Sequence, residues 1–269
     1  MNQPSIPVVM TFSGHDPGGG AGIQADIEAV ASMGCHAAPV ITAHTVQNTH
    51  NVISVTPADT TLLIQQARAI LEDMEVSAFK IGLLASIEVT EAVHSLLVDY
   101  PGIPVVVDPV LFAGGGSRLV DEGLLSAMRT LLLPLTTILT PNSFEARTLA
   151  AEADNLDACA HKLLDDGCEF VLITGTHENT PAVENRLYSH HRHMDTFTWE
   201  RLPASYHGSG CTLAAAIAGL LAQGGDIPAV IEEAQAYTWE TLRHGYRVGM
   251  GQFLPNRLFW AVVDEGLDQ

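Results

Sequence analysis

Short runs of β-branched and other apolar residues alternate along most of this chain with longer stretches whose apolar residues recur at helical spacing. The apolar runs are Val8–Phe12, Ala38–Thr42, Phe79–Ile81, Val105–Val107, Thr137–Leu139 and Phe170–Ile173. The helical stretches are Gly22–Met33, Asp59–Met74, Ile87–Leu97, Glu122–Leu132 and Ala158–Asp166. Strands that alternate with helices are typical of a parallel sheet covered by helices on both faces. The pattern therefore predicts an α/β fold.

The pattern changes in the last third of the chain. Arg186–Ser189 and Thr196–Trp199 flank a polar turn, which predicts an antiparallel hairpin at one edge of the sheet. Two helices are expected after it, at Cys211–Ala222 and Ile227–Arg243. Because no repeat and no long linker interrupts the pattern, we expect one domain over residues 1–269.

The charge of the chain excludes several kinds of partner. Twelve Lys and Arg stand against 31 Asp and Glu, which gives a formal net charge of −19. Nucleic acids and anionic membranes would be repelled by this excess, so we expect neither as a partner. No apolar run reaches the roughly 18 residues of a membrane span, and Met1–Pro7 does not resemble a secretion signal.

The four cysteines lack metal-site spacing and favour reduced thiols in a cytoplasmic protein. Lysines are scarce, since Lys80 and Lys162 are the only two in the sequence. A protein of this composition that handles phosphate would need another source of positive potential.

Two glycine-rich segments stand where a strand or loop meets a helix. The first, Ser13–Gly22, follows the opening strand, and its glycines permit close approach of a ligand to the backbone, although a flexible turn fits equally well. The second, His207–Leu213, leads into an apolar helix, where successive N–H groups of Gly208, Ser209 and Gly210 can form an anion-binding nest. At such a helix start we expect the pKa of the Cys211 thiol to be lowered.

Oxygen ligands follow two other predicted strands. Asn142 and Glu145 lie three residues apart at the start of a helix, where they could hold a hydrated Mg²⁺ or form an ordinary helix cap. Asp108 closes the Val105–Val107 strand and is expected to point into the same region, because ligands gather at the carboxyl ends of parallel strands.

Six segments taken together resemble the ribokinase-like superfamily. They are GHDPGGGAGIQAD at 14–26, TAHTVQNT at 42–49, KIGLLA at 80–85, DPV at 108–110, LTPNSFEA at 139–146 and HGSGCTLAAA at 207–216. More narrowly, they are similar to the hydroxymethylpyrimidine/phosphomethylpyrimidine kinases of thiamine biosynthesis. The resemblance implies a three-layer α/β/α sandwich, usually dimeric. It also implies transfer of phosphate from ATP, with Mg²⁺, to 4-amino-5-hydroxymethyl-2-methylpyrimidine and then to its monophosphate.

The resemblance also implies roles for particular residues. Gln47 falls at the pyrimidine contact, which suits a carboxamide that offers a donor beside an acceptor. On the substrate side it places Gly14, Asp16, Gly19, Ala21 and Leu83. Around the phosphates and Mg²⁺ it places Asp108, Asn142, Thr174 and Glu145, and at the anion hole Gly208, Ser209 and Gly210, with Cys211 where the superfamily has its catalytic base.

The sequence departs from the family pattern at two lysines. Thr174 stands where a phosphate-binding lysine is usual, and Ala113–Gly116 lacks the lysine expected in that loop. Arg118, His177 or His207 could supply the missing charge. A hydroxyl at position 174 keeps pyridoxal kinase open as an alternative activity, and the missing charge keeps open a pyrimidine-binding protein without catalysis. The histidines at 190, 191 and 193 are expected in a solvated turn rather than a metal site.

Overall fold

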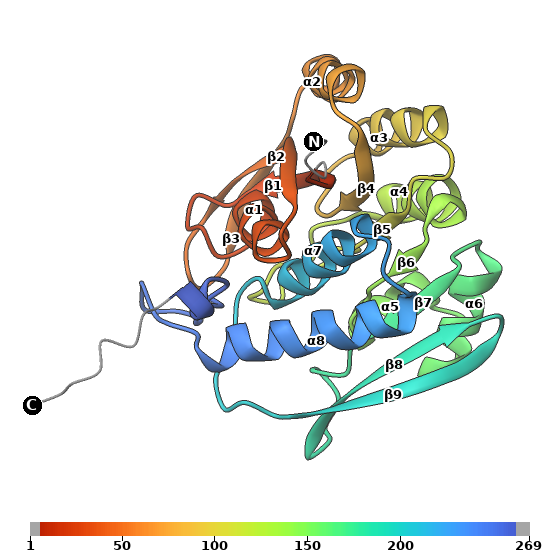
Figure 1. Ribbon diagram of the computed structural model, residues 1–269. Helices are drawn as coiled ribbons and strands as arrows, with labels where there is room; N and C mark the ends of the chain where they lie inside the picture. The colour runs from red at the N-terminus through yellow and green to blue at the C-terminus, as the bar shows by residue number, and fades with distance from the viewer. Residues whose placement is uncertain (1–5, 262–269) are drawn as a thin grey trace, which may run out of the picture.

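The computed structural model describes residues 6–261, and within them nine strands form one sheet (Figure 1). Their order across the sheet is β3-β2-β1-β4-β5-β6-β7-β8-β9. The strands are β1 (Val8–His15), β2 (His36–Gln47), β3 (Val52–Pro57), β4 (Val76–Ile81), β5 (Val105–Val107), β6 (Ile138–Leu139), β7 (Phe170–Ile173), β8 (Ala182–Ser189) and β9 (Arg192–Glu200). Six neighbouring strands of this order, β2, β1, β4, β5, β6 and β7, run parallel, as the alternating sequence pattern predicted.

Antiparallel strands complete the sheet at both edges. The predicted hairpin is confirmed as β8 and β9, which pair from Ala182 with Glu200 to Ser189 with Arg192. At the opposite edge β3 pairs antiparallel with β2, and the sequence did not predict this strand. Every residue of β3 is exposed or half-buried, so the strand shows no buried alternation that would have revealed it.

Helices cover both faces of the sheet, which confirms the three-layer sandwich. On one face α1, α7 and α8 pack against strand residues such as Val9, and on the other α2 to α6 pack against residues such as Met10. The side chains of neighbouring strand residues thus pack on opposite faces of the sheet. The helices are α1 (Gly22–Ser32), α2 (Thr60–Asp73), α3 (Ile87–Asp99), α4 (Glu122–Ala127), α5 (Ser143–Leu149), α6 (Leu156–Asp165), α7 (Ser209–Ala222) and α8 (Ile227–Arg243).

Local sequence signals explain where several helices begin and end. Asp59 accepts a hydrogen bond from the Leu62 backbone N–H at 2.8 Å and starts α2. The stretch predicted as one helix over Glu122–Leu132 instead changes to a wider turn at Met128–Leu132. A short 3₁₀ turn with Pro134 follows, because proline cannot continue a helical hydrogen-bond ladder.

Within residues 6–261, no helix has both the length and the apolar character that crossing a membrane requires.

Candidate active site

A cavity of about 950 Å³ opens where the parallel strands end. Its walls come from the segments after β1, β4, β5, β6 and β7 and from the start of α7. The residues predicted for the site that line the cavity are Gly14, Asp16, Ala21, Gln47, Leu83, Asp108, Asn142, Glu145, Thr174, Gly208, Ser209, Gly210 and Cys211. Gly19 belongs to the same glycine-rich loop but does not line the cavity. The fold therefore brings nearly all of these residues together.

The loop after β1 is held in shape by a single carboxylate. Asp16 is buried and accepts hydrogen bonds from the backbone N–H groups of Gly18 at 2.7 Å, Gly20 at 3.0 Å and Ala21 at 2.9 Å. Gly19 adopts a φ of +72°, which glycine tolerates best. The loop is thus fixed by internal bonds, in contrast to the flexible turn that the sequence left open.

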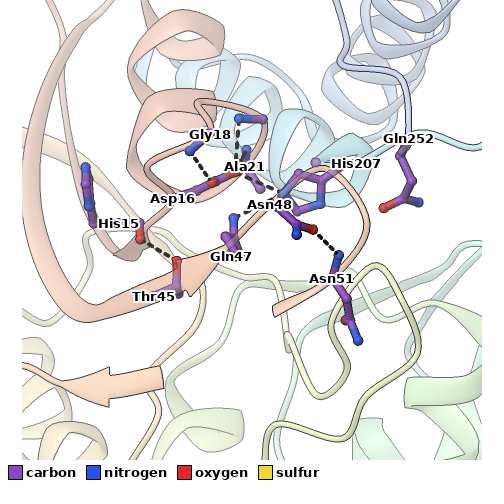
Figure 2. A network of polar contacts seen from close by, with 12 residues as sticks. His15, Asp16, Gly18, Ala21, Thr45, Gln47, Asn48, Asn51, His207 and Gln252 are labelled. Carbon is purple, nitrogen blue, oxygen red and sulfur yellow. Dashed lines mark hydrogen bonds and ion pairs between the residues drawn. The ribbon is translucent and has the colours of Figure 1, made fainter. Parts of the chain in front are cut away.

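Two side chains from distant segments meet Asp16 at the cavity wall (Figure 2). The Nε2 atom of His207 lies 3.0 Å from the Asp16 carboxylate and 3.4 Å from Nε2 of Gln47. Burial alone would raise the pKa of Asp16, but hydrogen bonds from His207, Gln47 and Gly18 outweigh burial and hold that pKa well below its usual range. Asp16 is therefore an anion at neutral pH. Asp16 and His207 are 191 positions apart in the chain, so no local sequence motif could have predicted their contact.

An apolar side chain also lines the cavity. Leu83 lines it directly after β4, and a side-chain carbon placed on Gly14 would lie 3.1 Å from Leu83 Cδ2. Glycine at position 14 therefore lets the Leu83 side chain pack against the backbone of the first loop.

The second glycine-rich segment packs directly on the first. Gly208 has a φ of +88°, and a side-chain carbon there would overlap the carbonyl oxygen of Gly20. The buried Arg257 guanidinium donates to that same carbonyl, to Thr212 Oγ1 at 2.8 Å and to Glu28 at 3.1 Å. Arg257 lies far from every motif in the sequence, so its role in joining the two loops could not be predicted.

A buried carboxylate lies beneath the start of α7. A side-chain carbon on Gly210 would be 3.6 Å from Asp108 Oδ1, so the helix start and the carboxylate are neighbours. Oδ2 of Asp108 is buried without a hydrogen-bond partner among the described residues. Burial raises the pKa of Asp108, although the positive charge of Lys80 and a hydrogen bond from Cys211 oppose this effect.

Lys80 lies behind the same helix start. Its side chain is fully buried, with Nζ 2.8 Å from Asp26 Oδ1 and 3.0 Å from Ser13 Oγ. Burial would lower the pKa of Lys80, but the negative charges of Asp26, Cys211 and Asp108 raise it above its usual range. Lys80 thus stays protonated beneath the predicted anion site, in a buried pair whose two charges offset each other. A single lysine at the end of an apolar strand was the signal that could have identified it.

The environment of Cys211 differs from the sequence-based expectation. We expected the helix start to lower the pKa of the thiol, but burial and the nearby charge of Asp108 raise it to about 12. A helix start exerts only a partial positive charge, which does not compensate for burial beside a carboxylate. Cys211 is therefore a neutral thiol at neutral pH.

Asn142 and Glu145 form the helix cap that the sequence allowed. Asn142 Oδ1 accepts from the backbone of Glu145 at 3.0 Å, and Glu145 Oε2 accepts from the backbone of Asn142 at 2.9 Å, which starts α5. The Glu145 carboxylate nevertheless lines the cavity and is buried. Burial, followed by the charge of Asp108, raises the pKa of Glu145 to about 8. Two neighbouring carboxylates that repel each other in a buried site fit a divalent cation.

Thr174, which stands where the family has a lysine, has a short side chain and a backbone that is hydrogen-bonded to a neighbouring segment. The Thr174 N–H donates to the Pro141 carbonyl at 2.9 Å, which ties the end of β7 to the start of α5. Among the suggested cations, Arg118 pairs with Glu122 and does not line the cavity. His177 and His207 do line it, with His177 stacked on Phe144 at 4.8 Å between ring centroids.

Two arginines that sequence reasoning missed also line the cavity. Arg147 pairs with Glu178 at 2.7 Å, whereas the Arg201 guanidinium donates to backbone carbonyls of Thr176 and Glu178. Arg201 has no carboxylate within ion-pair distance in the part of the chain that the structure describes. Its charge is therefore available to an anion in the cavity.

The histidines at 190, 191 and 193 lie outside this site. His190 and His191 have φ values of 48° and 55° and form the exposed turn between β8 and β9. Residues 6–261 contain no group of three His, Cys, Asp or Glu side chains arranged to hold a metal ion.

Comparison with known proteins agrees with this geometry. Residues 16–256 match the family model for phosphomethylpyrimidine kinase. A hydroxymethylpyrimidine/phosphomethylpyrimidine kinase from Synechococcus elongatus is 36% identical over 92% of this chain and 96% of its own. The enzyme of the same description from Streptomyces coelicolor is 35% identical over 91% of this chain and 92% of its own.

Solved structures with the same fold include two kinds of vitamin kinase. A Bacillus subtilis pyridoxal kinase in complex with ADP superposes with a TM-score of 0.88 at 26% identity, covering 96% of this chain and all of its own. A phosphomethylpyrimidine kinase from Clostridium difficile has a TM-score of 0.75 at 30% identity, covering 88% of this chain and all of its own. The sequence matches and the shared fold show that this chain belongs to the phosphomethylpyrimidine kinase family.

Proposed function

We propose that the protein transfers phosphate from ATP to 4-amino-5-hydroxymethyl-2-methylpyrimidine and then to its monophosphate, which yields the diphosphate used in thiamine biosynthesis. One observation carries the proposal. Gln47, which suits an aminopyrimidine edge, lines the same cavity as the helix start at Gly208–Cys211, which suits a phosphate. A ring-binding end and a phosphate-binding end in one cavity favour phosphoryl transfer onto the ring's hydroxymethyl group.

The substrate end combines a polar edge with an apolar wall. Gln47 offers an amide oxygen and an amide N–H to the ring, while Leu83 packs against its face. Asp16 and Gly19 shape the loop, and the backbone of Gly14 and Ala21 lies beside the ring. A loop fixed by internal bonds positions the acceptor hydroxyl at little entropic cost, which favours reaction.

At the phosphate end, backbone N–H groups of Gly208, Ser209 and Gly210 stabilise the charge on the transferring group. Lys80 lies behind them in an ion pair with Asp26, so its charge is largely offset and the positive potential at this end comes mainly from the helix start itself. Phosphoryl transfer depends mostly on positioning and charge stabilisation, so a strong base is not required. Cys211, as a neutral thiol, then acts through its hydrogen bond to Asp108 rather than as a base.

Asp108 and Glu145 are the residues that would hold Mg²⁺, mainly through water. The fit rests on the unpartnered Oδ2 of Asp108 and on the raised pKa of Glu145. Bound there, the cation would neutralise charge on the ATP phosphates. Asn142 and Thr174 lie beside this point, and Arg201 supplies a further cation at the cavity wall. Nucleotide binding is supported by relatives of known structure, which were solved with ADP or an ATP analogue.

The direct test is incubation of the purified protein with ATP, Mg²⁺ and hydroxymethylpyrimidine, followed by mass spectrometry. We expect the monophosphate first and the diphosphate later. A folded sample that makes neither product would overturn the assignment. Tight pyrimidine binding by calorimetry without turnover would instead support a binding protein on the same scaffold.

Pyridoxal kinase is the second candidate, and one observation favours it. The pyridoxal kinases of Bacillus subtilis and Staphylococcus aureus superpose on this chain with TM-scores of 0.88 and 0.86, above the 0.75 of the Clostridium difficile enzyme. The values of kcat/KM for pyridoxal and for hydroxymethylpyrimidine decide between them. A Gln47→Ala variant is expected to lower kcat/KM for the pyrimidine more than for pyridoxal.

We also propose that the protein forms a homodimer. Val46 and Ile53 on β2 and β3 are 57% and 70% exposed, and Met250 is 83% exposed. The segment containing Met250 is bonded to the β2–β3 turn through Thr49, so these apolar side chains lie in one region. Sedimentation equilibrium should give twice the monomer mass, and Ile53→Lys with Met250→Lys should give the monomer.

A further inference from the structure

The orientation of the Gln47 carboxamide is set by its neighbours. Its Nε2 atom lies on the side of Asp16 and His207, as Figure 2 shows, at 3.4 Å from His207 Nε2. His207 Nε2 is itself 3.0 Å from the Asp16 carboxylate. Because Asp16 is an anion that accepts three backbone N–H groups as well, His207 must carry a proton on Nε2 and donate it. The 3.4 Å contact between the two Nε2 atoms is therefore not a hydrogen bond, since both nitrogens donate toward Asp16.

The same anion decides which end of the Gln47 amide faces it. An amide oxygen turned toward Asp16 would place two acceptors together, whereas the amide NH₂ group can donate there. One Nε2 hydrogen is then directed to Asp16. The other hydrogen, cis to Oε1, remains beside Oε1 as a donor–acceptor pair at the cavity.

We propose that Asp16 is a positioning residue that holds Gln47 in this single orientation, with His207 as the second donor to the same carboxylate, and that Asp16 thereby makes the site select a 4-amino ring over the same ring with oxygen at that position. The inference rests on the proposed function for the identity of the ring. A 4-aminopyrimidine presents an N–H donor beside a ring nitrogen acceptor, which matches Gln47 as held. The 4-oxo ring presents an acceptor beside an N–H donor, which is the reverse pattern.

To bind the 4-oxo ring, Gln47 would have to rotate its oxygen toward the Asp16 carboxylate. A site built to pair with particular donors and acceptors discriminates strongly when a ligand leaves its buried polar groups unmatched. We therefore expect the wild-type protein to prefer the amino ring in kcat/KM by about 10³-fold or more.

The experiment measures kcat/KM for hydroxymethylpyrimidine and for its 4-oxo analogue in the wild type, Asp16→Asn and His207→Asn. Asp16→Asn should reduce the preference by about tenfold or more, because Gln47 can then rotate, whereas His207→Asn should reduce it less, because the Asp16 carboxylate remains. In a Gln47→Ala background, the Asp16 and His207 substitutions should leave the preference unchanged. This double-mutant cycle separates an effect transmitted through Gln47 from a general loss of structure.

Asp59→Asn is the matched control for Asp16→Asn. Asp59 also accepts a backbone hydrogen bond at a helix start but does not line the cavity, so the preference should remain as in the wild type. Equal losses of activity toward both rings, with an unchanged preference, would overturn the proposal. Calorimetric Kd values for both rings give the same ratio without turnover. Absence of catalysis would therefore count against the proposed function. A ratio of the Kd values for the two rings that stays unaltered in the variants would count against this inference.

Discussion

Lys80 and Asp26 form an ion pair with 2.8 Å between Nζ and Oδ1, and neither side chain is exposed to solvent. Removing one member of a buried pair leaves an uncompensated charge, which typically costs about 3–5 kcal/mol. We expect Lys80→Met to lower the free energy of unfolding in urea by that amount.

Lys162 is the matched control for this prediction, because it is the other lysine of the chain. It pairs with Asp166 at 2.7 Å on α6 but is partly exposed, so Lys162→Met should change stability by less than about 1 kcal/mol. A double variant, Lys80→Met with Asp26→Asn, should recover part of the loss. Equal effects of the two lysine substitutions would contradict the prediction.

Gly208→Ala should damage catalysis more than it damages the fold. The added carbon meets the Gly20 carbonyl, so the backbone of the helix start must shift away from the phosphate position. Loss of one well-placed backbone donor costs about 10²–10³ in kcat. Steady-state kinetics with ATP and the pyrimidine measures the effect.

Gly224→Ala controls for the backbone conformation alone. Gly224 has a φ of +80°, close to that of Gly208, but nothing lies within 4 Å of an added carbon there. It should cost about 1–2 kcal/mol in stability while kcat stays unchanged. If both variants lost kcat equally, the close packing of the two loops would not explain the effect.

The raised pKa of Glu145 predicts a pH dependence of stability in the metal-free protein. Between its ordinary value of 4.5 and about 8, the folded protein keeps a proton that the unfolded chain has lost. The free energy of unfolding should therefore fall as pH rises through this window, by a few kcal/mol, and level off above it.

Urea unfolding of the wild type and Glu145→Gln, at several pH values between about 5 and about 9, tests this dependence. The wild type should lose stability with rising pH relative to the variant, and added Mg²⁺ should restore more stability at the alkaline end. Parallel pH profiles would show that Glu145 does not titrate as we expect.

A pKa of about 12 for Cys211 predicts that the thiol is not the catalytic base. Cys211→Ala should keep kcat within about tenfold of the wild type, whereas loss of a general base typically costs about 10²–10⁴. The pH–rate profiles of the wild type and of Cys211→Ala should also show the same inflections. A loss of kcat beyond about 10² in a folded variant would restore the base role.

The net charge of −19 predicts that added salt stabilises the protein. Screening weakens repulsion among the surface carboxylates, as in proteins adapted to a salty cytoplasm. The melting temperature should rise between low and about molar KCl, while an equally concentrated neutral solute serves as the control. A melting temperature that does not respond to KCl would count against this interpretation.

Much of the fold follows from local patterns, and the exceptions have local causes. The bounds of α8, β5 and β7 agree with the sequence prediction, because their apolar residues pack on a core at regular spacing. The strand β3 escaped prediction since it borders the sheet without a buried face. The predicted helix over 122–132 is interrupted near Pro134, where backbone geometry overrides the apolar pattern.

Within the site, motifs identified the residues but not their electrostatic state. Gln47 and the glycines of both loops could be found from sequence, because close backbone approach requires those residue types at those spacings. The neutral state of Cys211 depends on burial beside Asp108. The orientation of Gln47 depends on Asp16, whose other side-chain donor, His207, lies 191 residues further along the chain. Such dependence on distant partners has no signature in a local motif.

The contact of Arg257 with Gly20 has a consequence for how the protein is made. The first glycine-rich loop leaves the ribosome well before the guanidinium that joins it to the second loop, because Arg257 lies 237 residues further along the chain. Chains grow from the N-terminus, so the site reaches its final form only after Arg257 has been synthesised. Unfinished chains can therefore carry the motifs of a kinase without its assembled catalytic centre.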